Sequence, residues 1–122
     1  KEKLASFFKS DKCIFICFLL ITLGVCAQQV IWGLGNPEKP NDYTLINNYL
    51  IFKNSFKHLL DNLNLYTTYP NEYYDLYKYS PTFAVFMSPF NLLPVGLGVC
   101  IWTLINSFSV FYTVKKLPVD AS

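Results

Sequence analysis

The sequence predicts an all-α membrane protein in which two transmembrane helices are joined by an external loop that carries an amphipathic interfacial helix. Three observations predict this fold class. Two long stretches of the 122-residue chain, 13–33 and 80–114, contain no charged residue. Between them, the apolar residues of segment 43–62 recur every three or four positions. Charged residues make up 15% of the chain, well below the roughly 25% that is usual for soluble domains.

The first uncharged stretch, 13–33, has the length of a single membrane span. A helix of about 20 apolar residues crosses the hydrocarbon core of a bilayer. Gln28 and Gln29 are its only strongly polar members, and Trp32 suits the aromatic belt at a membrane boundary. The competing interpretation is a cleaved signal peptide, whose apolar region is shorter, about 7–15 residues. The length of the stretch therefore favours a retained transmembrane helix at 13–33.

The second stretch, 80–114, is too long for one perpendicular span. Three prolines interrupt it: Pro81, Pro89 and Pro94. Because proline removes a helix donor and disfavours helix at the preceding residue, we expect a break within this stretch. The prediction is a short re-entrant or interfacial segment at 81–91 and a second transmembrane helix at 92–114, with Pro94 in its first turn. Asn106 and Ser107 are expected to face protein rather than lipid.

The distribution of lysine predicts the orientation, since the chain has no arginine. Segment 1–12 has four lysines against two acidic residues, and segment 115–122 has two lysines against one. The loop between the spans, 34–80, has four lysines against five acidic residues. The positive-inside rule therefore predicts cytoplasmic segments at 1–12 and 115–122 and an external loop at 34–80. Abundant tyrosine and lysine without arginine is typical of an AT-rich bacterial genome. The expected location of the protein is the bacterial cytoplasmic (inner) membrane.

The external loop contains an expected helix at 43–62. Its apolar positions follow a helical repeat: Leu45, Tyr49, Phe52, Phe56, Leu59 or Leu60, and Leu63. Its expected polar side carries Asn47, Asn48, Lys53, Lys57 and Asp61. Asn41 or Asp42 is expected to cap its N-terminus. An amphipathic helix directly outside a membrane span lies along the interface or packs on other external parts of the protein.

Segment 65–79 is rich in tyrosine, which accounts for six of its fifteen residues. Tyrosine is amphipathic and favours the headgroup layer, so one interpretation is an interfacial loop. The other interpretation is a wall for a sugar or a polyprenyl phosphate, where rings stack and hydroxyls form hydrogen bonds. Composition alone favours the interfacial loop.

The sequence contains no motif of a soluble enzyme, such as a Gly-rich dinucleotide fingerprint, a P-loop or a zinc-protease helix. The single histidine, His58, follows Lys57 on the expected helix, where a lone histidine is usually structural. The four cysteines lie in the expected spans and are interpreted as small buried hydrophobes rather than metal ligands. The net charge of +2 is spread along the chain, which argues against a nucleic-acid partner.

The order of residues in the loop and the second span is similar to that of a known family. The features are Asn41-Asp42-Tyr43, Asn48-Tyr49, Leu65-Tyr66, Lys78-Tyr79-Ser80-Pro81-Thr82-Phe83, Ser88-Pro89-Phe90, Leu93-Pro94, Trp102 and Asn106. Over residues 12–114 the chain resembles the N-terminal part of glycosyltransferase family 87. These are polytopic membrane enzymes of the GT-C type and include mannosyltransferases that use polyprenyl-phosphate mannose. Ser80 stands where family members typically have the first proline of a tyrosine-proline-proline run.

The resemblance implies a polyprenyl-phosphate-linked sugar as donor substrate and a glycan or lipid as acceptor. No residue pattern requires a metal, and we expect neither metal nor cofactor. Asp42 matches the carboxylate that GT-C enzymes carry in the first external loop, which implies that it is the catalytic base. Lys78 is implied to stabilise the departing lipid phosphate. Four tyrosines are implied to wall the substrate site: Tyr73, Tyr74, Tyr77 and Tyr79. A helix-capping role for Asp42 and a snorkelling role for Lys78 are the structural alternatives.

Family members are several times longer than this chain, and its first residue is lysine. We therefore expect a fragment of a GT-C polytopic fold, whose partners are membrane lipid and the remaining transmembrane helices of the same chain. The main alternative is a non-enzymatic two-span membrane adaptor or subunit of an envelope complex. A transporter fragment is a weaker alternative, because Gln28, Gln29 and Asn106 are the few intramembrane polar residues available.

Overall fold

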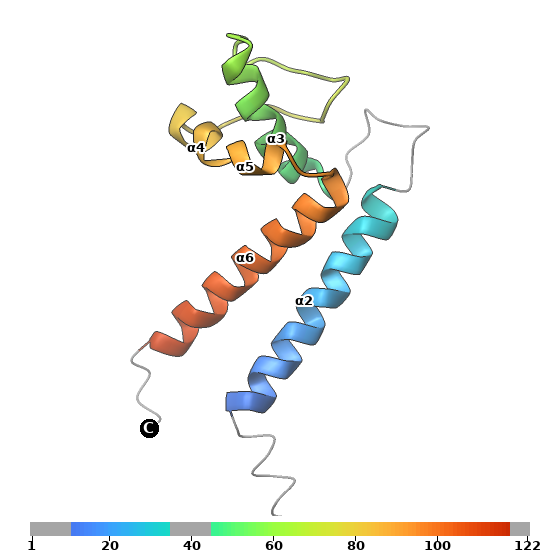
Figure 1. Ribbon diagram of the computed structural model, residues 1–122, viewed down its shortest axis with the longest axis vertical. Helices are drawn as coiled ribbons and strands as arrows, with labels where there is room; N and C mark the ends of the chain where they lie inside the picture. The colour runs from blue at the N-terminus through green and yellow to red at the C-terminus, as the bar shows by residue number, and fades with distance from the viewer. Residues whose placement is uncertain (1–10, 35–44, 118–122) are drawn as a thin grey trace, which may run out of the picture.

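The computed structural model describes residues 11–34 and 45–117, and these residues form helices without any strand. The helices are α2 (Asp11–Gly33), α3 (Asn47–Leu60), α4 (Pro81–Phe86), α5 (Ser88–Asn91) and α6 (Val95–Lys116). Figure 1 shows α2 and α6 side by side as a long pair, with the other helices gathered at one end. We call α2 and α6 the helix pair and residues 45–94 the head.

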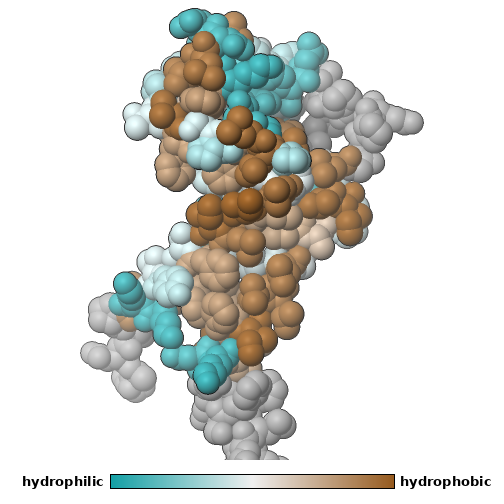
Figure 2. All heavy atoms as spheres, viewed as in Figure 1, coloured by the Kyte–Doolittle hydropathy of each residue, from teal (hydrophilic) through white to brown (hydrophobic). Residues whose placement is uncertain are grey.

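Both members of the helix pair are long and apolar enough to cross a membrane. Their 23 and 22 residues correspond to about 33–35 Å of helix, against a hydrocarbon core of about 30 Å. Only 11% of the most apolar window of each helix is buried, whereas the core helix of a soluble protein is mostly buried. Figure 2 shows this apolar surface as a belt between hydrophilic residues at the two ends. The predicted all-helical architecture with two such helices is confirmed.

The two long helices run antiparallel and make a few specific contacts. Thr103 Oγ1 donates a hydrogen bond of 2.7 Å to Gln29 Oε1 near the head. At the opposite end, Lys115 Nζ lies 2.7 Å from Asp11 Oδ2. Phenylalanine rings pack near that ion pair, with Phe15 and Phe111 in an edge contact at a centroid distance of 5.5 Å. Gln29, one of the two glutamines of α2, is thus bonded to α6.

The second long helix begins three residues later than predicted. Pro94 precedes α6 with an extended backbone (φ −54°, ψ 143°) instead of lying in its first turn. The predicted 81–91 segment forms two short helices, and each has a proline in its first turn, where the missing N–H costs nothing. Asn106 does not face protein among the described residues: it is exposed, and its Nδ2 donates to Trp102 O at 2.8 Å.

Helix α3 is buried on two sides, which the sequence did not predict. One stripe, Asn47, Ile51, Ser55 and His58, is buried at the i, i+4, i+8, i+11 spacing of one helix face. Asn47 is therefore a core residue and not part of the polar side. Leu45 and Leu63, which were expected to be apolar contacts, are exposed. Of the alternatives Leu59 and Leu60, Leu59 packs against the head and Leu60 is exposed. The expected cap at Asn41 or Asp42 and the first residues of helix 43–62 lie outside the described residues.

Two hydrophobic clusters organise the head. The first joins the head to α6 through Ile46, Tyr49, Met87, Phe90 and Val99. The second lies inside the head and consists of Ile51, Leu65, Tyr73, Tyr77 and Ala84. Helix α3 contributes to both, so it connects the loop 61–80 to the helix pair. The packing is tight at Gly98, because a Cβ atom there would lie 1.8 Å from Tyr49 Oη.

Candidate functional site

The predicted catalytic base, Asp42, lies in segment 35–44, outside the described residues, and its role stays a prediction. The described ends of that connection are Leu34 and Leu45. They flank the point where α2 meets the head, since a Cβ atom on Gly33 would lie 2.7 Å from Ile46 Cγ2. The connection that contains Asp42 therefore begins and ends where the first long helix meets α3.

Two of the predicted substrate-binding tyrosines, Tyr73 and Tyr77, are core residues of the head. Their side chains are 2% and 1% exposed. Tyr77 Oη donates a hydrogen bond of 2.6 Å to Ser80 O, while Tyr73 Oη has no partner among the described residues. Burial raises the pKa of both phenols, because an apolar environment disfavours the phenolate. Neither ring lies at a surface that a substrate reaches without rearrangement of the head.

The other two predicted tyrosines, Tyr74 and Tyr79, are exposed. Asn47 fixes the position of Tyr74: its Oδ1 accepts from Tyr74 N and its Nδ2 donates to Tyr74 O, both at 2.7 Å. Tyr74 is therefore held at the N-terminal end of α3, close to Leu45. The ring of Tyr79 packs against Phe52 at a centroid distance of 5.0 Å and leaves half of its surface open.

Lys78, the predicted phosphate ligand, forms an ion pair with Asp75 at the surface of the head. Lys78 Nζ lies 2.6 Å from Asp75 Oδ2, and both side chains are largely exposed. This hydrogen bond, with one from the Leu76 backbone, holds the pKa of the Asp75 carboxyl below its usual value. Because an exposed pair of this kind contributes little to stability, the Lys78 ammonium can exchange its partner at small cost.

Lys53 is a residue whose role the sequence did not predict. Its ammonium donates to Phe90 O at 3.2 Å and Asn91 O at 3.4 Å, and also to Leu93 O. These carbonyls end α5 and form the turn before α6, where proline interrupts the helical hydrogen bonds. Burial lowers the pKa of Lys53. The signal was present in the sequence, because Lys53 follows Tyr49 by four residues and so shares its face.

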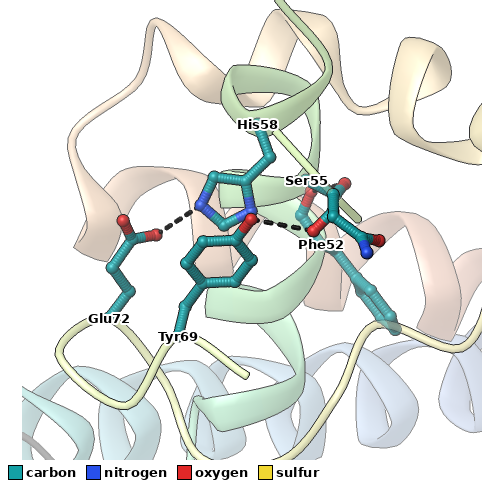
Figure 3. A network of polar contacts seen from close by, with 6 residues as sticks. Phe52, Ser55, His58, Tyr69 and Glu72 are labelled. Atoms are coloured by element: carbon teal, nitrogen blue, oxygen red, sulfur yellow. Dashed lines mark hydrogen bonds and ion pairs between the residues drawn. The ribbon is translucent and has the colours of Figure 1, made fainter. Parts of the chain in front are cut away.

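His58 joins α3 to the loop that follows it (Figure 3). Its Nε2 lies 2.9 Å from Glu72 Oε2, and its ring stacks on Tyr69 at a centroid distance of 3.8 Å. The histidine is 1% exposed, and its Nδ1 has no hydrogen-bond partner among the described residues. These contacts give His58 a structural role in closing the loop over α3, as expected for a lone histidine on a helix.

Five aromatic residues meet where the head joins α6, and we call them the aromatic junction: Phe52, Tyr79, Phe83, Phe90 and Trp102. The Trp102 ring contacts Phe90 at a centroid distance of 5.7 Å and Phe52 at 5.8 Å. Phe83 lies 5.3 Å from Tyr79 and 6.2 Å from Trp102. Four of the five belong to the ordered residues on which the resemblance to the glycosyltransferase family depends. Those residues therefore build one contact between the head and the second long helix.

The chain matches no protein-family model, no curated protein and no solved structure. Within residues 11–34 and 45–117, no three His, Cys, Asp or Glu side chains form a group that could hold a metal ion.

Proposed function

We propose that the chain is the N-terminal two-span part of an integral-membrane glycosyltransferase of the GT-C type. It moves a mannose-like hexose from a polyprenyl-phosphate donor to a hydroxyl acceptor with inversion. The observation that carries this proposal is the aromatic junction. Four residues of the junction belong to the series that resembles glycosyltransferase family 87. They meet in space at one interface, as expected if the series builds a structural element common to the family.

The arrangement of head and helix pair suits a lipid-linked donor. The exposed apolar belt of the helix pair fits the hydrocarbon core, where the polyprenyl tail of the donor dissolves. The head, at one end of that belt, presents tyrosines and a lysine at the level where the phosphate and the sugar emerge. With lysine concentrated in the terminal segments, the head lies outside the cytoplasmic membrane.

In the proposed reaction, Asp42 accepts the proton of the acceptor hydroxyl as that oxygen attacks the anomeric carbon of the sugar. A bond forms between the acceptor oxygen and the anomeric carbon, and the bond from that carbon to the phosphate oxygen breaks. The electron pair leaves with the polyprenyl phosphate. Because the leaving group is anionic, a cation stabilises it better than a general acid does, and Lys78 supplies one when it exchanges Asp75 for the phosphate.

The four tyrosines divide into two roles under this proposal. Tyr74 and Tyr79 are exposed and offer rings on which a sugar can stack. Tyr73 and Tyr77 are buried and hold the loop 61–80 in shape, so that Lys78 keeps its place at the surface.

The decisive experiment uses the native polypeptide in its own membrane, supplied with radiolabelled polyprenyl-phosphate mannose. Asp42→Asn removes the base and is expected to abolish transfer, by at least about 100-fold for the loss of a general base. Asp42→Glu keeps a carboxylate and is the conservative variant. Asp61→Asn, which changes an exposed acid of the head, is the matched control and is expected to keep full activity. Normal transfer by Asp42→Asn overturns the assignment of the base.

A non-enzymatic adaptor is the second candidate, and one observation favours it. Val85, Phe86 and Leu92 of the head are exposed apolar side chains, with Leu92 86% exposed, and such a surface suits a protein partner. In that case Asp42→Asn leaves function unchanged, whereas Phe86→Ser prevents assembly of an envelope complex. The intact mass of the native polypeptide separates the candidates further. A mass several times 14.1 kDa supports the polytopic enzyme, and a mass near 14.1 kDa supports the adaptor.

A further inference from the structure

The end of the helix pair that lies away from the head carries a charged pair between two apolar grooves. Asp11 at the start of α2 and Lys115 in the last turn of α6 form the ion pair of 2.7 Å, and both side chains are exposed. One groove lies on each side of this pair, and Phe111 lines both. Figure 2 shows hydrophilic residues at this end directly next to the apolar belt.

The first groove combines cations with an apolar floor. It has a volume of about 380 Å³. Its polar lining includes Lys12, Lys115 and the hydroxyl of Tyr112. Its apolar surface is formed by Phe15, Ile16 and Phe111. Lys12 forms no ion pair with another described residue. With Asp11 beside them, the two lysines leave this groove with a net charge of +1.

The second groove is similar in size but differs in charge. It has a volume of about 350 Å³ and shares Asp11, Phe111 and Lys115 with the first. Its other lining residues are apolar: Ile14, Phe18, Val110 and Val114. Because its only lysine is the one paired with Asp11, the second groove has no net charge. The two grooves therefore form a natural comparison between a cationic and a neutral site on the same helices.

We propose that the first groove binds an anionic phospholipid of the surrounding leaflet. Its phosphate accepts hydrogen bonds from the ammonium groups of Lys12 and Lys115 and from the hydroxyl of Tyr112. The first part of one acyl chain lies over Phe15, Ile16 and Phe111. This end of the helix pair is the boundary between charged and apolar surface, which is the depth of the headgroups in a bilayer. The proposal is independent of the proposed transfer reaction, because it concerns the opposite end of the helices.

The charges favour a lipid over a further helix as the occupant. A helix packed into the first groove covers Lys12 and leaves an ammonium group without a partner, which is costly at the edge of the membrane. A phospholipid brings the missing negative charge with it. An anionic headgroup is preferred over phosphatidylcholine, because the choline cation of the latter is repelled by the same lysines. Each lysine near a membrane surface adds about 1 kcal/mol of attraction for anionic lipid.

The test counts the lipids that stay bound to the native full-length polypeptide. The protein is reconstituted in vesicles of equal parts phosphatidylglycerol and phosphatidylcholine, extracted in mild detergent and examined by native mass spectrometry. We expect retained phosphatidylglycerol to exceed phosphatidylcholine. Lys12→Gln is expected to lower this preference about five-fold, the equivalent of one lysine. Lys116→Gln, beside Lys115 but not in the groove lining, is the matched control and is expected to change nothing.

A second pair of variants tests the location without changing the charge. Ile16→Trp fills the first groove and is expected to remove the bound phosphatidylglycerol. Val114→Trp fills the second groove to a similar extent and is expected to leave it bound. Equal effects of Lys12→Gln and Lys116→Gln mean diffuse attraction to the surface and overturn the proposal. Absence of any phosphatidylglycerol preference in the unaltered protein also overturns it, since another occupant then covers the groove.

Discussion

The head and the helix pair differ in how far their apolar side chains are buried within the protein. In the head, Tyr73, Tyr77 and Met87 are 2% exposed or less, and side chains bond to the backbone between segments distant in the chain. In the helix pair, Leu20, Ile21 and Val114 are each at least 60% exposed, and a small set of polar contacts crosses between the helices. The difference indicates that the head obtains its fold from its own residues, whereas the helix pair needs lipid or further helices to cover it.

The largest expected effect concerns the connection between the two regions. Lys53→Met removes the ammonium that bonds to the carbonyls of Phe90, Asn91 and Leu93, and leaves them without this donor. A buried carbonyl that loses its partner costs about 1–3 kcal/mol, and these three are partly buried, with Phe90 O keeping its bond from Leu93 N. We expect a loss of about 3 kcal/mol, measured by thermal unfolding in detergent with near-ultraviolet circular dichroism.

The control for this prediction is Lys57→Met, one turn further along α3. Lys57 is exposed, so its replacement is expected to stay within about 0.5 kcal/mol of the unaltered protein. If the two variants are equally stable, the Lys53 ammonium does not connect the head to α6.

The sequence predicts the exposed helix pair better than it predicts the buried contacts of the head. The first long helix was predictable because about 20 uncharged residues in a row favour one continuous apolar helix that is long enough to cross a bilayer. The position of Lys53 was missed because a single-residue polarity scale assigns lysine to solvent. It takes no account of the carbonyls in the turn before α6, where Pro94 has no N–H to donate to Phe90 O. Asn47 was missed for the same reason, since its buried side chain forms hydrogen bonds with the backbone of Tyr74.

The candidate site was harder to predict than the fold. Six tyrosines in fifteen residues indicate a tyrosine-rich surface, but they do not indicate which rings face inward. The loop 61–80 lacks a helical or strand repeat, so burial of Tyr73 and Tyr77 depends on long-range packing against α3. Three of the ordered residues, Tyr79, Phe83 and Trp102, meet in the aromatic junction. The family resemblance itself stays a prediction. The chemistry assigned to Asp42 stays a prediction.

A middle-sized effect compares the two buried tyrosines of the head. Tyr77→Phe removes the hydrogen bond of 2.6 Å to Ser80 O and is expected to cost about 1 kcal/mol. Tyr73→Phe removes a hydroxyl that has no partner among the described residues, so it is expected to leave stability unchanged or raised. Thermal unfolding of both variants decides this, and an equal loss for both contradicts the assignment of distinct hydroxyl environments.

The same tyrosines predict an alkaline limit to the stability of the head. Burial raises the pKa of Tyr73 and Tyr77 above the ordinary value of about 10, so the folded state keeps protons that the unfolded chain releases. The folded state binds more protons above pH of about 10, and stability therefore falls as the pH rises beyond that value. Tyr73→Phe is expected to make stability depend less on pH in this range. Thermal unfolding at a series of alkaline pH values measures this dependence.

The smallest effect tests the claim that few contacts hold the helix pair together. Gln29→Leu removes the hydrogen bond of 2.7 Å from Thr103, and interhelical hydrogen bonds of this kind in membrane proteins contribute about 0.6 kcal/mol. Gln28→Leu is the control, because Gln28 is the neighbouring glutamine and is exposed. Chemical crosslinking of cysteines placed on the two helices measures their association in vesicles. If Gln29→Leu alone lowers the free energy of helix association by well over 1 kcal/mol, the helix pair depends on this contact. Contacts within the chain would then determine the arrangement of the helix pair, as they do in the head.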